Sequence, residues 1–118
     1  MEKILVVDDA TFVRLKYVKS LRNDGYEVEE ATNGAEALEK YKANRPDGVL
    51  LDINMPVMDG LVTLHEIMNY DPTARVAMVT CIGSQSVVLT ALKTGARDFV
   101  TKPTDDSGLL NTVQKLLG

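Results

Sequence analysis

Residues 3–9 read KILVVDD, and residues 48–52 read GVLLD. Both are short apolar runs that end in carboxylates, and such runs are typical of strands buried on both faces of a parallel sheet. If the two strands are neighbours, the side chains of Asp8, Asp9 and Asp52 meet at one edge of the sheet. Three like charges repel, so we expect a divalent cation or a strongly electropositive ligand there.

Around these two runs, the chain alternates apolar stretches with segments of helical period. The predicted strands cover residues 3–7, 26–31, 48–51, 75–79 and 98–101. The first predicted helix covers residues 11–23, the second follows an N-cap at Asn33, and the third follows Asp59-Gly60. The fourth runs from Ser84 to Gly95, and the fifth begins at Asp105 or Asp106. Five strand–helix units in series predict an α/β fold, a five-stranded parallel sheet with five helices on both faces.

The strand order follows from which strands can be buried. The first, third and fourth strands are nearly unbroken apolar runs, so they should be central. The second, from Tyr26 to Glu30, is too charged for the centre, and the fifth begins with Arg97 and Asp98. Right-handed crossovers then favour the order 2-1-3-4-5, the flavodoxin-like (βα)5 arrangement. This order opens a crevice between strands one and three, at the end where the three aspartates lie.

Periodicity also predicts which helix faces are buried. In the first helix, Phe12, Leu15, Val18 and Leu21 share one face, and Arg14 lies with the other basic residues away from it. In the last helix the expected buried set is Leu110, Val113, Leu116 and Leu117.

The fourth helix carries more apolar residues than one face can bury. Val88, Ala91 and Leu92 should pack on the sheet, which leaves Val87 or Leu89 exposed near Phe99 of the edge strand. We expect a partner surface at Val87, Leu89 and Phe99, because exposed apolar patches commonly mark partner sites.

Composition narrows the class of protein. A chain of 118 residues is expected to be a single domain over residues 1–118. Its net charge of −4 argues against direct nucleic-acid binding. No apolar stretch approaches the roughly 20 residues of a membrane span, and the N-terminus does not read as a signal peptide, so we expect no membrane and a cytoplasmic location.

Two further polar residues stand at the ends of predicted strands. Thr80 ends the fourth strand and Lys102 ends the fifth. Carboxylates with room for water and phosphate oxygens suit Mg²⁺, and a cation and a hydroxyl beside them can hold a phosphoryl group. One aspartate can then act as the nucleophile.

Taken together, these motifs closely resemble the receiver domain of two-component response regulators, most of all the stand-alone chemotaxis type. The matching residues are Asp8-Asp9, Asp52 with Met55-Pro56 and Asp59-Gly60, Thr80, and Lys102-Pro103. The resemblance implies that Asp52 is the phosphoacceptor and that Asp9 binds Mg²⁺ directly, with Asp8 acting mainly through water or supporting Asp9. Asp52 and the backbone carbonyl of Asn54 would supply further metal ligands.

The resemblance also implies a switch. Lys102 would pair with Asp52 and then with its phosphoryl group, Thr80 would move toward that group, and Phe99 would follow as the aromatic switch residue. A phosphohistidine on a sensor histidine kinase or a histidine phosphotransfer protein would be the donor. A downstream protein target would bind the fourth helix, fifth strand and fifth helix, and phosphorylation-dependent dimerisation is possible. Arg14 and Lys16 would be candidates for kinase docking.

One departure from the family pattern concerns turnover. Ile82, two residues after Thr80, is apolar where fast-hydrolysing relatives carry polar or acidic side chains, and Asn54 offers little help to water. We therefore expect slow hydrolysis of the aspartyl phosphate. The resemblance implies a protein that promotes only its own phosphorylation and dephosphorylation, so we do not expect an enzyme in the turnover sense.

Three alternative functions stay open at the level of sequence. The chain could be a receiver excised from a larger regulator with DNA-binding or enzymatic output. It could be a phosphatase with an aspartyl nucleophile, which would need a second aspartate where Asn54 stands. It could also be a flavin carrier on the same fold, although no Ser/Thr/Gly-rich phosphate loop follows the first strand.

Overall fold

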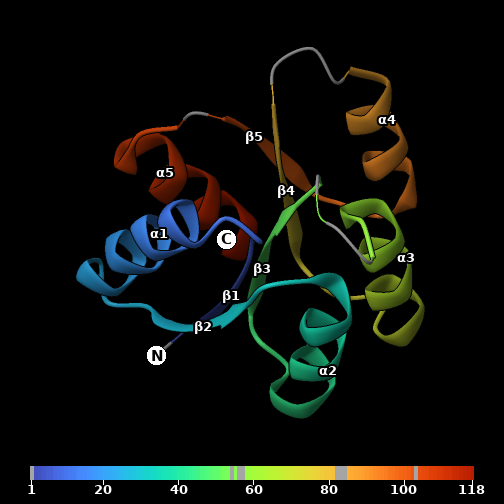
Figure 1. Cartoon of the computed structure of the whole chain (residues 1–118), viewed down its shortest axis with the longest axis horizontal. Coiled ribbons are helices and arrows are strands. Elements are labelled where there is room, and N and C mark those ends of the chain that lie inside the picture. The colour runs from blue at the N-terminus through green and yellow to red at the C-terminus, as the bar shows by residue number, and fades with distance from the viewer. Residues whose placement is uncertain (1, 54, 56–57, 82–84, 103) are drawn as a thin grey trace.

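A computed structural model describes residues 2–53, 55, 58–81, 85–102 and 104–118. In this part of the chain, five parallel strands form one sheet in the order β2-β1-β3-β4-β5, as predicted (Figure 1). The strands are β1 (Lys3–Val7), β2 (Glu27–Ala31), β3 (Gly48–Asp52), β4 (Val76–Cys81) and β5 (Asp98–Lys102). The helices are α1 (Thr11–Asn23), α2 (Gly34–Asn44), α3 (Gly60–Tyr70), α4 (Gln85–Thr94) and α5 (Asp106–Leu117).

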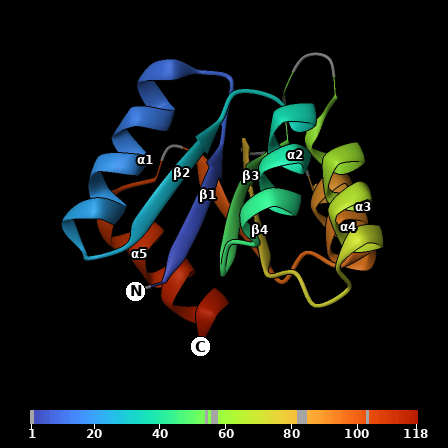
Figure 2. The same cartoon turned by 90° about the horizontal axis from the view of Figure 1, so that it is seen from below.

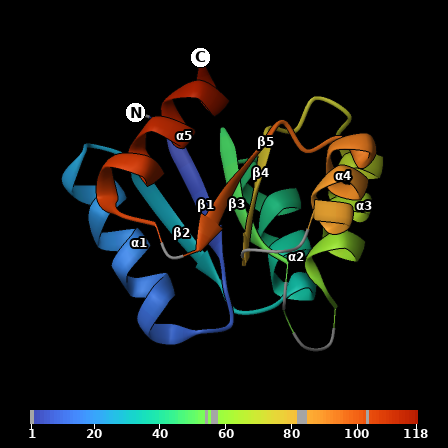
Figure 3. The same cartoon turned by 90° about the horizontal axis from the view of Figure 1, so that it is seen from above.

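Helices cover both faces of the sheet. Helices α1 and α5 lie on one face, and α2, α3 and α4 lie on the other (Figures 2 and 3). Because strand side chains alternate between faces, Leu5 and Val7 pack in the core under α2, α3 and α4, whereas Ile4 and Val6 pack in the core under α1 and α5. The two layers of core explain why the central strands are apolar at nearly every position.

Burial confirms the reasoning that placed β2 and β5 at the edges. Every residue of β3 is buried, and so are the last four of β1. In β2 two of the five residues are buried and in β5 only one, and the others are exposed or half-buried. Charged side chains are tolerated at an edge because part of each edge strand faces water.

Side-chain caps set the start of three helices. Asn33, Asp59 and Asp105 each accept a hydrogen bond from a backbone N–H three residues on, at 2.8, 2.9 and 2.7 Å. At the start of α3, a Cβ on Gly60 would lie 2.3 Å from the carbonyl oxygen of Asp52. A glycine is therefore needed for α3 to begin so close to the end of β3.

The predicted buried face of α1 is wrong at its N-terminal half. Phe12 is 82% exposed and Leu15 is 51% exposed, whereas Arg14 is only 8% exposed. The helix is rotated so that Arg14, Tyr17, Val18 and Leu21 face inward. This set has the spacing of one helical face as well, and the sheet below decides between the two.

Smaller corrections concern α4 and α5. Leu92 is 39% exposed rather than packed on the sheet, and Val87 packs against the core rather than facing solvent. In α5 the fully buried leucine is Leu109, and Leu110 and Leu117 are only partly buried. None of the helices in the described residues combines the length and apolar character needed to span a bilayer.

Candidate functional site

Three carboxylates meet where β1 and β3 end. These strands pair in register up to Val7 and Leu51, so Asp8 and Asp52 continue two neighbouring strands. One carboxylate oxygen from each of Asp8, Asp9 and Asp52 lies within 4.8 Å of the others. Asp8 and Asp52 are buried, at 1% and 3% exposure, and Asp9 is exposed. The carboxylates therefore meet at the switch-point crevice, with one of them open to solvent.

Lys102 places a cation between the two buried carboxylates. Its Nζ lies 3.1 Å from Asp8 Oδ2 and 3.3 Å from Asp52 Oδ1. Burial alone would lower the pKa of Lys102, but the hydrogen bond to Asp8 and the charge of Asp52 outweigh it, and the pKa is raised above its ordinary value. The pairing with Asp8 was not anticipated from the sequence, which suggested Asp52 alone.

Thr80 lies beside this cluster at the end of β4. The register pairs Asp52 with Val79, so Thr80 stands one position beyond the end of β3. Its side chain is buried, at 2% exposure. The structure thus brings together the three aspartates, Lys102 and the Thr80 end of β4.

Phe99 lies away from the acidic cluster. It belongs to β5, pairs in register with Met78, and is 43% exposed. Leu89 is 58% exposed on α4, as the sequence suggested for one of the two candidates there. Asn54 and Ile82 fall outside the described residues, so their expected roles stay predictions.

Two residues near the site were missed by sequence reasoning. Tyr17 is 5% exposed, and burial raises its pKa, against the lowering effect of the Lys102 charge and with smaller contributions from the charges of Asp8 and Asp52. Arg14 donates from Nη1 to the backbone carbonyl of Asp8 at 2.8 Å. The sequence signal that could have found both is the second helical face of α1, on which Arg14 and Tyr17 lie together.

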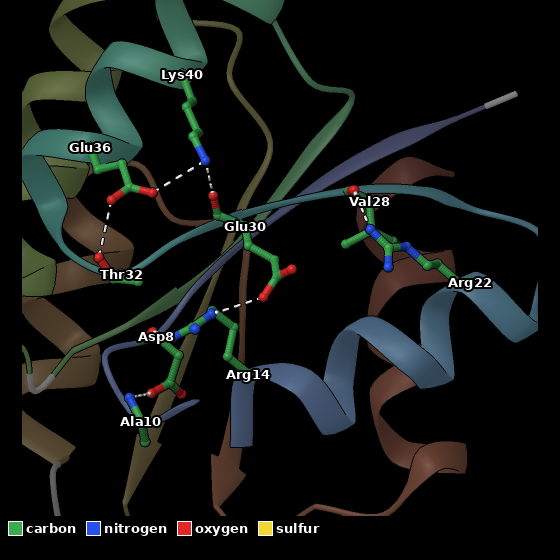
Figure 4. Close-up of polar contacts among 9 residues, drawn as sticks. All are labelled: Asp8, Ala10, Arg14, Arg22, Val28, Glu30, Thr32, Glu36 and Lys40. Atoms are coloured by element: carbon green, nitrogen blue, oxygen red, sulfur yellow. Dashed lines mark hydrogen bonds and ion pairs between the residues drawn. The ribbon is translucent and has the colours of Figure 1, made fainter. Parts of the chain in front are cut away.

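Every polar atom of Asp8 has a partner. Its N–H donates to the carbonyl of Ala31 at 3.1 Å, and its Oδ1 accepts from the N–H of Ala10 at 2.9 Å. Its carbonyl accepts from Arg14 (Figure 4), and its Oδ2 accepts from Lys102. A buried aspartate with all its groups bonded keeps one orientation, which suits a metal ligand or its support.

The donor set fits Mg²⁺. Carboxylate oxygens are hard ligands, and Mg²⁺ is usually held by one or two carboxylates together with waters and phosphate oxygens. Asp8, Asp9 and Asp52 offer such a set, with Asp9 on the solvent side, where waters would complete the coordination shell of a bound ion. The site is therefore compatible with the metal-binding acidic pocket of receiver domains.

Comparison with known proteins identifies the family. The model of the response regulator receiver domain matches residues 4–114. The chain belongs to this family. This receiver is 43% identical to the chemotaxis protein CheY of Thermotoga maritima and 46% identical to that of Bacillus subtilis, each over 98% of this chain and 97% of the relative.

Solved structures agree with the assignment. The chemotaxis protein CheY4 of Vibrio cholerae superposes with a TM-score of 0.95 at 34% identity and covers 99% of both chains. NtrX of Brucella abortus superposes with a TM-score of 0.94 at 32% identity, and the match covers 99% of this receiver but 27% of NtrX. The same domain therefore occurs both in small chemotaxis proteins and within larger regulators. A CheY-like receiver implies a histidine kinase upstream and a downstream target.

Proposed function

We propose that this receiver accepts a phosphoryl group on Asp52 from a phosphohistidine and thereby switches the binding of a protein target. The observation that carries the proposal is the convergence of Asp8, Asp9 and Asp52 at the ends of two central strands, with Lys102 within 3.1–3.3 Å of two of them. Three carboxylates in one crevice repel one another unless cations compensate them, and phosphoryl transfer needs a metal, a nucleophile and a compensating cation together.

The transfer uses the residues in separate roles. A carboxylate oxygen of Asp52 attacks the phosphorus of the phosphohistidine, the new O–P bond forms, and the N–P bond breaks with the electron pair returning to the imidazole. Asp8, Asp9 and Asp52, with the Asn54 carbonyl, would hold Mg²⁺, which would neutralise charge on the transferring phosphoryl group. Lys102 compensates the remaining charge on one side of Asp52, and Thr80 donates a hydrogen bond to the bound phosphoryl oxygen.

The output is a shift between two conformations. The phosphoryl group gives Thr80 and Lys102 new partners, so a state in which both contact it becomes favoured. Leu89 and Leu92 on α4 and Phe99 on β5 are exposed at 58%, 39% and 43%, which supports this side as the target surface. The protein acts as a switch that changes its own state, not as a catalyst that turns over a substrate.

The central test is phosphorylation by a small phosphodonor such as acetyl phosphate, read by intact mass. We expect wild type to gain the mass of one phosphoryl group when Mg²⁺ is present and not when EDTA is present. Asp52→Ala should gain none. The control is Asp24→Ala, a change at an exposed aspartate after α1, which should behave as wild type. Equal labelling of Asp52→Ala and wild type would overturn the proposal.

A further inference from the structure

A buried arginine on α1 contacts the backbone of the acidic pair. Among the basic residues of α1, which the structure describes in full, Arg14 alone is buried, and Lys16, Lys19 and Arg22 are exposed. A buried guanidinium costs several kcal/mol of lost hydration unless charge and hydrogen bonds compensate it. The expectation that Arg14 docks a kinase from the helix surface is therefore wrong, and its position calls for a different role.

Two contacts hold the guanidinium of Arg14. Its Nε donates to Glu30 Oε1 at 2.9 Å, and its Nη1 donates to the carbonyl oxygen of Asp8 at 2.8 Å (Figure 4). The second contact is made to the peptide that joins Asp8 to Asp9. The planar guanidinium presents its donors in a rigid fork, so the position of Glu30 sets the direction from which this carbonyl is held.

Glu30 is itself anchored from outside the site. In the edge strand β2 it pairs in register with Val6 of β1, and its backbone carbonyl accepts a hydrogen bond from Lys40 Nζ. Lys40 also forms an ion pair with Glu36 at 3.2 Å. Figure 4 shows this series of contacts running from α2 through β2 to the β1–α1 turn. The turn is thus tied to elements that contribute no ligand of their own.

We infer that Arg14, held by Glu30, is a positioning residue for the metal ligands Asp8 and Asp9. By fixing the carbonyl of Asp8, it fixes the peptide plane from which both carboxylates project toward Asp52. The inference rests on the proposed Mg²⁺ site. Groups that orient metal ligands typically change metal affinity by about 10- to 100-fold when they are removed.

The sign of the effect separates positioning from simple electrostatics. Arg14 is a cation near a cation site, so by charge alone its removal would strengthen Mg²⁺ binding. Positioning has the opposite consequence, because a loosened Asp8–Asp9 peptide holds the carboxylates less well. Arg14→Met should therefore weaken Mg²⁺ binding about 10-fold or more, despite the more favourable net charge.

The test measures Mg²⁺ affinity of the unphosphorylated protein by calorimetry, together with the amide NMR signals of Asp9 and Ala10 without metal. Arg14→Met should weaken binding and shift both amides. Glu30→Gln should weaken binding less, and should add little in the Arg14→Met background, because Glu30 acts through Arg14. Arg14→Lys, which keeps the charge but lacks the fork, should recover only part of the affinity.

The matched control is Arg22→Met. Arg22 also lies on α1 and donates to a β2 backbone carbonyl, that of Val28 at 3.3 Å, but it does so at the other end of the strand. Arg22→Met removes the same charge as Arg14→Met and also removes a hydrogen bond from a guanidinium to a backbone carbonyl. It should leave Mg²⁺ affinity nearly unchanged. Urea unfolding in EDTA measures how much stability each variant loses.

Several outcomes would contradict the inference. Wild-type or tighter Mg²⁺ binding by Arg14→Met would make Arg14 a structural cation only, as would a loss no larger than that of Arg22→Met. If Arg14→Met does not fold, unchanged affinity in both Arg14→Lys and Glu30→Gln would likewise show that Arg14 has only a structural role. Failure of wild type to bind Mg²⁺ is a different result, because it overturns the proposed function and the inference together.

Discussion

At the scale of single residues, buried side-chain polar atoms in the described part of the chain all have hydrogen-bond partners. Asp8 in the acidic cluster is one case, and Asp71 after α3 is another. Asp71 accepts from the hydroxyl of Tyr41 at 2.8 Å and from the hydroxyl and N–H of Thr73 at 2.6 and 3.0 Å. These hydrogen bonds lower the pKa of Asp71 in spite of partial burial. The tyrosine therefore connects the end of α2 to the end of α3 through one carboxylate.

We expect Tyr41→Phe to lower the free energy of unfolding by about 1–3 kcal/mol at neutral pH, because Asp71 loses a buried donor. The control is Tyr70→Phe, which removes the hydroxyl of an exposed tyrosine whose ring lies edge-on to Tyr41 at 6.3 Å. That change should cost clearly less. Urea unfolding measures both, and equal losses would contradict the argument.

The same pair predicts a pH dependence. Burial, and then the hydrogen bond to Asp71, raise the pKa of Tyr41 above its ordinary value of 10.0. The folded state thus prefers the neutral phenol, and this stability is fully present below pH 10 and is lost as pH rises toward the raised pKa. The stability difference between wild type and Tyr41→Phe should therefore shrink above about pH 10. If the stability difference instead grows with pH, the pKa of Tyr41 is not raised in the folded state.

At the scale of elements, α1 shows how two helical faces can compete. One face carries Phe12 and Leu15, and the other carries Arg14 and Tyr17. The second face can be buried because the half-buried Glu30 side chain and the Asp8 carbonyl both accept hydrogen bonds from Arg14. Burying an apolar side chain such as Phe12 would contribute about 1.5–3 kcal/mol to stability. Burying Arg14 instead forms charge-assisted hydrogen bonds, one of which also holds the β1–α1 turn.

This orientation of α1 is tested by two substitutions. Phe12→Ser should change the free energy of unfolding by no more than about 0.5 kcal/mol, since an exposed side chain loses little. Leu21→Ala should cost about 2–5 kcal/mol, because Leu21 is completely buried. Urea unfolding measures both variants. If Phe12→Ser loses as much free energy of unfolding as Leu21→Ala, this orientation of α1 is contradicted.

At the scale of the whole molecule, the proposed switch has to connect the acidic cluster with α4 and β5. Thr80 is placed for this, because it follows Val79, the register partner of Asp52, near the end of β4 and itself pairs in register with Thr101 of β5. We expect phosphorylation to shift the amide NMR signals of Leu89 and Phe99. In Thr80→Val the protein should still be phosphorylated, but these shifts should largely disappear, because the variant lacks the hydroxyl that we propose contacts the phosphoryl group.

Thr101→Val serves as the control for this experiment. Thr101 is the register partner of Thr80 on β5 and its side chain is exposed. Its hydroxyl can therefore be removed without changing the residues of the acidic cluster. It should keep both the phosphorylation and the amide shifts. Full-size shifts at Leu89 and Phe99 in phosphorylated Thr80→Val would rule out Thr80 as the connecting residue.

The sequence by itself determined the sheet, its strand order and the convergence of the three aspartates. Apolar runs, edge charges and right-handed crossovers are local or nearly local properties, so they can be read from one chain. The caps at Asn33 and Asp59 belong to the same class, because a capping side chain bonds a backbone group only three residues away.

Only the tertiary structure decided which face of α1 is buried, that Lys102 pairs with Asp8 as well as Asp52, and that Arg14 bonds the Asp8 carbonyl while Glu30 holds its guanidinium. Each of these depends on partners far apart in the chain, whose distance is set by how helices pack on the sheet. The helical period of α1 is compatible with two buried faces. Which one is buried depends on the side chains of β1 and β2, and the periodicity of α1 carries no information about them.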